Sequence, residues 1–287
     1  MKNYYPTISI ITPSYNMLSY LKCCHASIID QGIDVEHIVV DGGSTDRTVD
    51  WLKSQKDIIW ISEKDNGMYD AINKGLKLAR GEIIAYLNCD EQYLPGTLNF
   101  VKNYFEKNPT VDIIFGDFLI VDATGELICY RKAIQPRRIY ILSDYLYVFT
   151  CTMFFRRKIV DYGIYFDNSL KDVGDSDFVL NVLKNGYRAK HIKKYFSIFT
   201  MTGNNKFLKE NASSEAKKIL KNYKYLIPFK YILRIARLTE KFVNGAYFQR
   251  FPLIYEIYVD NDLSKRKEFI SSSGTFRLSI RKHRKNS

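Results

Sequence analysis

The first half of the chain alternates short apolar runs with amphipathic stretches, and this alternation restricts the fold more than any other feature. Four runs have the length and composition of buried strands, at residues 8–12, 35–41, 58–62 and 83–88. Helical patterns lie between and after them, at 18–29, from a cap at 44–46 to about 55, at 68–79 and at 95–108. Strands and helices that alternate at this spacing form right-handed βαβ units. We therefore predict an α/β domain with a mostly parallel sheet flanked by helices.

The second half is predicted to complete this domain and then to change character. A strand at 111–117, a hairpin at 118–132, a helix at 176–185 and a strand at 188–199 extend the first domain. We place its end near residue 205, which gives a domain at 1–205 and an extension at 206–287. Helices are expected in the extension at 213–225, 228–241 and 245–258, with a frayed segment from 264 onward.

The charge of the chain is concentrated in the extension. Residues 204–287 hold 19 of the 43 basic residues and only 7 of the 31 acidic ones, so they carry the whole net charge of +12. Such asymmetry suggests an anionic partner, either a membrane or a nucleic acid. Nucleic acid is the weaker alternative, because the basic residues alternate with apolar ones and no binding module is recognisable. The pattern at 225–238 suits a helix at a membrane surface, and simple packing on the first domain explains it equally well.

Composition excludes several classes of protein. The chain is 46% hydrophobic, which argues against disorder, and no apolar run reaches the roughly 18–20 residues of a membrane span. The N-terminus lacks the apolar core of a signal peptide, and the five cysteines show neither zinc nor disulfide spacing. We expect a cytoplasmic protein, with peripheral contact at the inner face of the cytoplasmic membrane as an option.

Polar clusters follow all four predicted strands of the first half. They are Thr12–Asn16, Asp41–Asp46, Glu63–Gly67 and Asn88–Glu91. In an open α/β sheet the carboxyl ends of the strands form the ligand-binding edge. Glycines after Asp41 permit close backbone approach, and carboxylates at such an edge can bind a hard cation and, through it, a diphosphate. This arrangement points to chemistry on a nucleotide-activated substrate.

In this order, the motifs resemble those of inverting family-2 glycosyltransferases, which have the Rossmann-like GT-A fold and in bacteria build surface polysaccharides. The resemblance covers about residues 6–205. It implies a nucleotide pocket in which Asp41 contacts the base and Asp65 lies close to the nucleotide. The remaining nucleotide-sugar contacts that it implies are Thr12, Pro13, Tyr15, Gly43, Asn88 and Asp90.

The expected metal motif departs from the family pattern. The family usually ends the fourth strand with Asp-x-Asp or Asp-Asp, whereas this chain has Asn88, Cys89, Asp90 and Glu91. The resemblance implies that Asp90 lies near the ribose and that Glu91, with Asp90, occupies the metal-ligand position. Glutamate is still a hard oxygen donor, so Mn²⁺ or Mg²⁺ is the expected cation.

A second acidic cluster supplies the expected general base. Direct displacement needs a carboxylate to accept the proton of the acceptor hydroxyl, and the family shows an acid-Asp-x-acid pattern at this place. Here Gly174 replaces the first acid, Asp175 has the position of the base, and Asp177 matches the second acid. The alternative is that Asp175 or Ser176 merely caps a helix.

Together these features predict a metal-dependent inverting glycosyltransferase of the hexosyl or N-acetylhexosaminyl type. Its donor would be a nucleotide sugar, most simply a UDP-sugar, and its acceptor a hydroxyl of a glycan or lipid-linked glycan. Two alternatives remain open: a non-catalytic nucleotide-sugar-binding protein of the same fold, and a sugar nucleotidyltransferase. The latter normally needs a glycine-rich basic loop after the first strand, and residues 12–16 do not form one.

Overall fold

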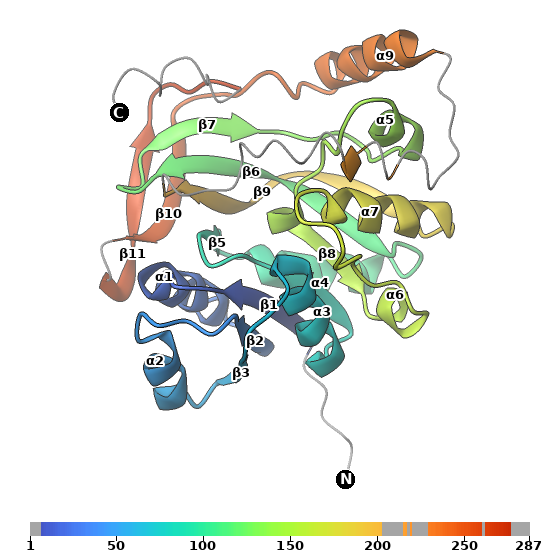
Figure 1. Cartoon of the computed structure of the whole chain (residues 1–287). Helices are drawn as coiled ribbons and strands as arrows, with labels where there is room; N and C mark the ends of the chain where they lie inside the picture. The colour runs from blue at the N-terminus through green and yellow to red at the C-terminus, as the bar shows by residue number, and fades with distance from the viewer. Residues whose placement is uncertain (1–6, 203–214, 217–218, 220–228, 260–261, 277–287) are drawn as a thin grey trace.

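The computed structural model describes residues 7–202, 215–216, 219, 229–259 and 262–276. The described chain contains a nine-stranded sheet in the order β3-β2-β1-β4-β8-β6-β9-β5, with β7 paired to β6 (Figure 1). Four parallel strands come from the N-terminal half: β1 (Ile8–Ser14), β2 (Val35–Asp41), β3 (Ile58–Ser62) and β4 (Ile83–Tyr86). They confirm the four predicted strands.

The second half adds strands in both directions. These are β5 (Glu91–Tyr93), β6 (Ile113–Asp122), β7 (Leu127–Arg131), β8 (Met153–Arg156) and β9 (Ala189–Met201). The long β6 and β9 run parallel, while β8 is antiparallel to β4 and β6. Most paired residues of the sheet therefore lie in parallel ladders, as predicted. The short β5, absent from the prediction, is antiparallel to the end of β9.

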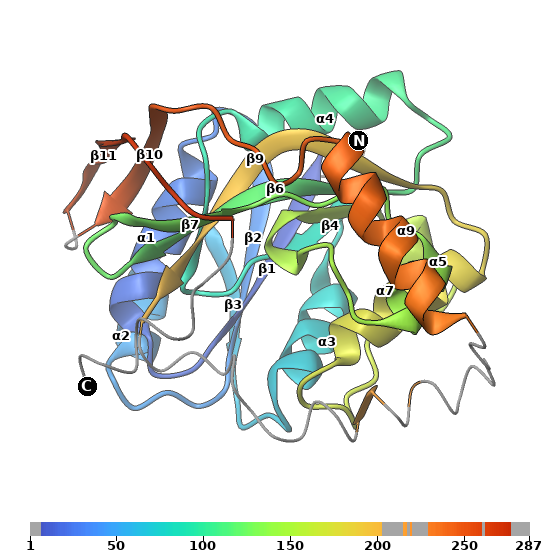
Figure 2. The same ribbon diagram turned by 90° about the horizontal axis from the view of Figure 1, so that it is seen from above.

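Helices cover both faces of the sheet (Figure 2). The helices of this domain are α1 (Leu18–Ile29), α2 (Thr48–Ser54), α3 (Met68–Leu78), α4 (Thr97–Lys107), α5 (Arg138–Ser143), α6 (Lys158–Asp161) and α7 (Gly174–Lys184), with a 3₁₀ turn at Thr150–Thr152. Along β1, Ile8 and Ile10 pack with α1 and α4, whereas Ile11 packs with α3 and α7. Successive strand residues point to opposite faces, so a strand with apolar residues on both sides supplies two cores at once.

The described part of the extension includes a helix and a hairpin. They are α9 (Lys230–Val243), β10 (Leu253–Val259) and β11 (Asp262–Ser271). The helix predicted at 228–241 is confirmed by α9. The prediction of a helix at 245–258 is wrong, because residues 253–258 lie in β10, and the prediction of fraying is wrong for residues 264–271, which lie in β11. Tyr255 and Ile257 are buried while Ile254 and Glu256 are exposed, which is the two-residue period of a half-buried strand. The helix predicted at 213–225 and the boundary near 205 fall mainly outside the described residues.

The two parts of the extension lie at opposite ends of the molecule. The hairpin packs beside α1, and α9 packs over α5 (Figures 1 and 2). Among the helices that the structure describes, none combines the length and apolar character that a membrane crossing requires.

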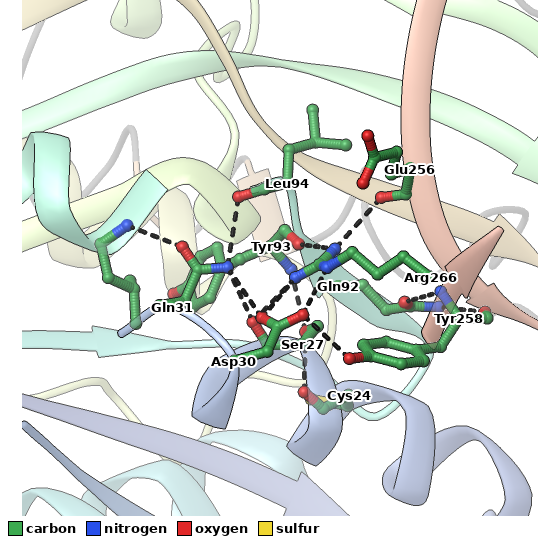
Figure 3. A network of polar contacts seen from close by, with 11 residues as sticks. Cys24, Ser27, Asp30, Gln31, Gln92, Tyr93, Leu94, Glu256, Tyr258 and Arg266 are labelled. Carbon is green, nitrogen blue, oxygen red and sulfur yellow. Dashed lines mark hydrogen bonds and ion pairs between the residues drawn. The ribbon is translucent and has the colours of Figure 1, made fainter. Parts of the chain in front are cut away.

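A polar network fixes the hairpin to the first domain (Figure 3). The guanidinium of Arg266 donates to both carboxylate oxygens of Asp30, at 2.5 and 2.7 Å, and to the carbonyl of Tyr93 at 2.8 Å. Gln92 and Tyr258 exchange two hydrogen bonds, at 2.8 and 2.9 Å. Because Gln92 and Tyr93 belong to β5, the hairpin braces the strand that begins at the acidic cluster.

Candidate active site

The four polar clusters come together at the carboxyl edge of the parallel strands. The side-chain oxygen of Asn16 accepts a hydrogen bond from the backbone N–H of Thr45 at 2.8 Å. The backbone N–H of Asn16 donates to Ser44 Oγ at 2.8 Å. The thiol of Cys89 donates to the carbonyl of Pro13 at 3.0 Å. The loops after β1, β2 and β4 therefore support one another, as the order of the motifs predicts.

Asp41 organises the loop after β2. Its side chain is fully buried, and Oδ2 accepts hydrogen bonds from the amides of Gly43 at 3.1 Å and Ser44 at 2.9 Å and from Ser62 Oγ at 2.6 Å. The hydroxyl of Ser44 donates to the other oxygen. A contact between Asp41 and a nucleotide base would have to compete with these donors. The contact stays a prediction, and the geometry gives Asp41 a clear structural task.

Asp65 and Tyr15 meet at Gly42 and form a more accessible part of the same sheet edge. A Cβ on Gly42 would lie 2.7 Å from an Asp65 carboxylate oxygen and 3.5 Å from the Tyr15 ring, so a larger residue there would displace the Asp65 carboxylate. Tyr15 is 61% exposed, and Asp65 is half-buried and accepts the amide of Gly67 at 2.8 Å. An exposed ring beside a carboxylate can stack on a base and accept a base N–H.

Thr12 lies beneath this sheet edge and is not exposed at it. Its side chain is completely buried, and Oγ1 is 2.9 Å from His37 Nε2 and 3.8 Å from Cys24 Sγ. The predicted framing of the pocket by Thr12 is therefore indirect, because its hydroxyl faces α1 and β2. Pro13, the next residue, is half-buried at the edge.

Glu91 faces Asn88 at the start of β5. Glu91 is 4% exposed, and its two carboxylate oxygens accept hydrogen bonds from the backbone amide of Asn88 at 2.8 Å and its side-chain amide at 3.2 Å. Burial, together with the negative charge of Asp90, raises the pKa of Glu91 to about 8. The side chain therefore holds its proton at neutral pH.

This environment bears directly on the expected cation. A carboxyl group is a good ligand for a hard cation when it is ionised, so Glu91 does not fit that role while it holds its proton and is buried against Asn88. No group of three or more histidine, cysteine, aspartate or glutamate residues in the described part of the chain could hold a metal. Asp90 is only partly buried, and Mg²⁺-type sites often use one or two carboxylates with phosphate oxygens. Asp90 therefore fits a cation that takes most of its ligands from a diphosphate.

Asp175 lies in the first turn of α7. Its Oδ1 accepts the amide of Ser176 at 2.7 Å, and the hydroxyl of Tyr69 approaches the same oxygen at 3.5 Å. Burial raises the pKa of Asp175 to about 6. The N-cap of α7 is Val173, without a side-chain cap bond, so the structure does not favour the alternative in which Asp175 or Ser176 is the cap.

The base candidate lies near the end of β4. Tyr86 is the last residue of that strand, and burial, followed by the charge of Asp175, raises the pKa of its phenol. Asp177 is also in the first turn of α7. Since residues two positions apart on a helix do not face the same way, Asp175 and Asp177 cannot share one task. The predicted supporting role of Asp177 stays a prediction.

Tyr69 explains why a glycine replaces the first acid of the family pattern. A Cβ on Gly174 would lie 2.6 to 2.9 Å from three atoms of the Tyr69 ring. That ring is 3% exposed and stacks on Phe166 with centroids 5.7 Å apart, so it cannot move aside freely. The sequence analysis did not single out Tyr69 as a site residue. Its place two residues after Gly67, in the first turn of a helix, was a usable signal that it lies near the site.

Glu215, from the extension, holds the loop that leads to Asp175. Its carboxylate accepts three consecutive backbone amides, from Lys171 at 2.9 Å, Asp172 at 2.9 Å and Val173 at 3.2 Å. The ammonium of Lys171 also donates to the carbonyl of Asn66, which joins this loop to the one after β3. Nothing in the local sequence of Glu215 indicated this contact, because it spans more than 40 residues of chain.

Comparison with known proteins adds three findings. The model of a family described as Glycosyl transferase family 2 matches residues 9–163. The chain is 34% identical over 122 residues to a PGL/p-HBAD biosynthesis glycosyltransferase of Mycobacterium bovis. The aligned stretch covers 40% of this chain and 48% of that relative, so the chain spans about half the length of the curated relative.

Among solved structures, the chain is similar to TarS 1-349 of S. aureus in complex with UDP-GlcNAc. The TM-score is 0.60 at 18% identity, over 83% of this chain and 74% of the other. A mannosyltransferase of Pyrobaculum calidifontis, in complex with GDP-Man and Mn2+, gives a TM-score of 0.52 at 18% identity, over 86% and 77%. At these identities the likeness is one of fold, and it confirms the predicted GT-A class.

Proposed function

The chain belongs to glycosyl transferase family 2, and on that premise we propose that it is a metal-dependent, inverting glycosyltransferase. The observation that carries this proposal is Asp175. It has a pKa of about 6 and lies in the first turn of a helix beside the convergent strand ends. A carboxylate with a pKa near the working pH suits general base catalysis.

The donor is a nucleotide sugar, and a UDP-sugar is our first choice. The exposed ring of Tyr15 and the carboxylate of Asp65 provide a stacking surface and an acceptor for a base, while Asp41 holds the backbone around Gly43. One structural neighbour was solved with UDP-GlcNAc and another with GDP-Man, so the fold accommodates either nucleotide. The transferred group is a hexosyl or N-acetylhexosaminyl unit.

The reaction is a single displacement at the anomeric carbon. Asp175 accepts the proton of the acceptor hydroxyl while the oxygen forms its bond to the anomeric carbon. The bond from that carbon to the diphosphate breaks on the opposite face, and its electron pair leaves with the nucleoside diphosphate. Tyr69 and the backbone amide of Ser176 orient the carboxylate of Asp175. Glu215 holds the loop that precedes Asp175 in the chain.

A divalent cation, Mn²⁺ or Mg²⁺, is part of the proposal. When bound, such an ion would offset the negative charge that develops on the leaving diphosphate. Asp90 is the protein ligand that we propose for it. The predicted ligand role of Glu91 would require its carboxylate to leave Asn88 and lose a proton.

We propose a hydroxyl of a glycan or lipid-linked glycan as the acceptor, used at the inner face of the cytoplasmic membrane. The alternative of a non-catalytic binding protein rested on the departures at Glu91 and Gly174. Contacts with Asn88 and with the Tyr69 ring account for both departures, so neither supports a loss of activity.

The first test is calorimetric titration with UDP and GDP, each with and without Mn²⁺. We expect one nucleotide to bind at least tenfold more tightly than the other, and to bind more tightly with the cation. Release of UDP from UDP-sugars in the presence of candidate acceptors then tests turnover. Absence of binding by either nucleotide would overturn the proposed function.

A further inference from the structure

Helix α9 packs on the protein with its charged side and turns its apolar side outward. Arg237 is 1% exposed and Lys241 is 3% exposed. In contrast, five apolar side chains of the helix are between 60% and 79% exposed: Tyr231, Ile232, Ile235, Phe242 and Val243. An amphipathic helix of a globular protein normally packs the other way round.

Specific contacts fix this orientation. Arg237 forms an ion pair with Asp144, and its guanidinium lies 4.6 Å from the ring centroid of Tyr145. Further along the helix, Glu240 pairs with Arg137 at 3.1 Å. Turning α9 to bury its apolar side would break these pairs and leave buried charges without partners, which is costly. The outward position of the apolar side is therefore built into the packing.

The exposed apolar side forms one continuous surface. Tyr231, Ile235 and Phe242 are spaced by four and seven residues and so lie on one face, with Ile232 and Val243 beside them. Phe248, 58% exposed, follows just after the helix. We call these six residues the α9 patch, and the residues that the structure describes leave it open. An exposed apolar patch of this kind marks an interaction site.

The exposed charges of the segment that carries the α9 patch are all positive. The exposed charged residues of segment 229–252 are Lys230, Arg234 and Arg250. The segment has a single acidic residue, Glu240, which is paired with Arg137. An exposed apolar helix face, in a segment whose exposed charges are all basic, matches a lipid bilayer with anionic headgroups.

We propose that the α9 patch binds the surface of an anionic lipid bilayer, with α9 lying in the headgroup plane. At 14 residues the helix is too short to span a bilayer and long enough to lie on one. A second copy of the chain fits less well. A two-fold contact through the same patch would bring together two extensions that each carry a net charge of +12.

Flotation of the full chain with lipid vesicles tests the proposal. We expect the protein to float with vesicles of phosphatidylcholine and phosphatidylglycerol, and binding to fall at least tenfold with phosphatidylcholine alone. A triple variant, Ile232→Ser, Ile235→Ser and Phe242→Ser, should lose at least tenfold in binding to the anionic vesicles, because it removes buried apolar area at the interface.

The chain offers a matched control elsewhere on its surface. Tyr162, Ile254 and Ile270 are 78%, 57% and 64% exposed and lie outside α9, so their replacement by serine should leave flotation unchanged. UDP binding, measured by calorimetry, should be the same in both triple variants and the wild type. This readout separates loss of lipid binding from loss of the fold or of the proposed donor site.

Three results would overturn the proposal. The wild type does not float with anionic vesicles, or the α9 variant floats as well as the wild type, or both triple variants lose flotation equally. A concentration-dependent dimer that the α9 variant abolishes, in a protein that does not float, would assign the patch to self-association instead.

Discussion

The turn between β4 and β5 and the start of α7 each contain a carboxylate whose pKa is raised by burial, but the two environments differ. Glu91 has a pKa of about 8, and both of its oxygens accept hydrogen bonds from Asn88. Asp175 has a pKa of about 6 and lies in the first turn of a helix whose dipole favours an anion.

The difference shows that burial alone does not make a catalytic base. Burial raises the pKa of both groups, yet Glu91 holds its proton through the neutral range while Asp175 can lose one within it. By this criterion Asp175 suits proton transfer, and Glu91 suits a structural role at the start of β5.

Asp175→Asn should have the largest effect. An amide of the same shape cannot accept the acceptor proton, so we expect kcat for UDP release to fall by roughly 100- to 10,000-fold. Binding of UDP should be unchanged, because the loops after β1 to β4 are untouched. Asp177→Asn is the matched control and should lose much less. Transfer at the wild-type rate in Asp175→Asn would remove Asp175 as the base.

The two acids of the β4–β5 turn should respond differently to a cation. We expect Asp90→Asn to abolish the enhancement of UDP binding by Mn²⁺, a loss of about tenfold, because Asp90 is the proposed protein ligand. Glu91→Gln should keep the enhancement. Calorimetric titration of both variants with UDP, with and without Mn²⁺, distinguishes them. The reverse pattern would restore Glu91 as the metal ligand.

Glu91 should also make stability depend on pH. Its pKa is about 8 in the folded chain against a normal value of 4.5, so the folded state binds the extra proton between these values. The free energy of unfolding should therefore fall as pH rises from about 4.5 to about 8. Urea unfolding at pH 6.5 and 8.5 measures the change, on the order of 1 kcal/mol in this window. In Glu91→Gln the fall should be smaller, and an identical fall would contradict the assignment.

The smallest expected effect concerns the hydroxyl of Tyr69. Activity should rise with pH through about 6 as Asp175 loses its proton. The Tyr69 hydroxyl favours the ionised form of Asp175 through a long contact of 3.5 Å, so Tyr69→Phe should move the midpoint upward by roughly half a pH unit or less. A pH profile of kcat measures this shift. A shift to lower pH would mean that the Tyr69 hydroxyl favours the protonated form of Asp175 and would contradict the prediction.

The N-terminal half could be predicted closely because its signals are local. The predicted bounds of α1, β2 and β3 are the observed ones, since each element is a periodic run that ends at polar or glycine-rich residues. The meeting of the four polar clusters also followed, because parallel strands place their carboxyl ends on one edge. The identity of the residues that face the ligand did not follow. Asp41 and Thr12 are turned inward by Ser62 and His37, partners from other strands.

The extension was harder to predict because its structure depends on distant partners. The residues of β10 are apolar apart from Glu256, so their strand period is visible mainly once β11 pairs with them. The salt bridge between Arg266 and Asp30 joins residues 236 positions apart. No local pattern can indicate such a contact, although it braces the strand next to Glu91.

The sequence by itself determined the α/β class, the family, the convergence of polar residues at one sheet edge and the position of Asp175. All of these depend on short-range periodicity and on motifs of a few residues. Only the tertiary structure decided that Glu91 is buried against Asn88, that the Tyr69 ring requires Gly174, and that α9 turns its apolar side outward. Each of these depends on which distant side chain fills a given space or neutralises a given charge, and that is fixed only when the whole chain packs.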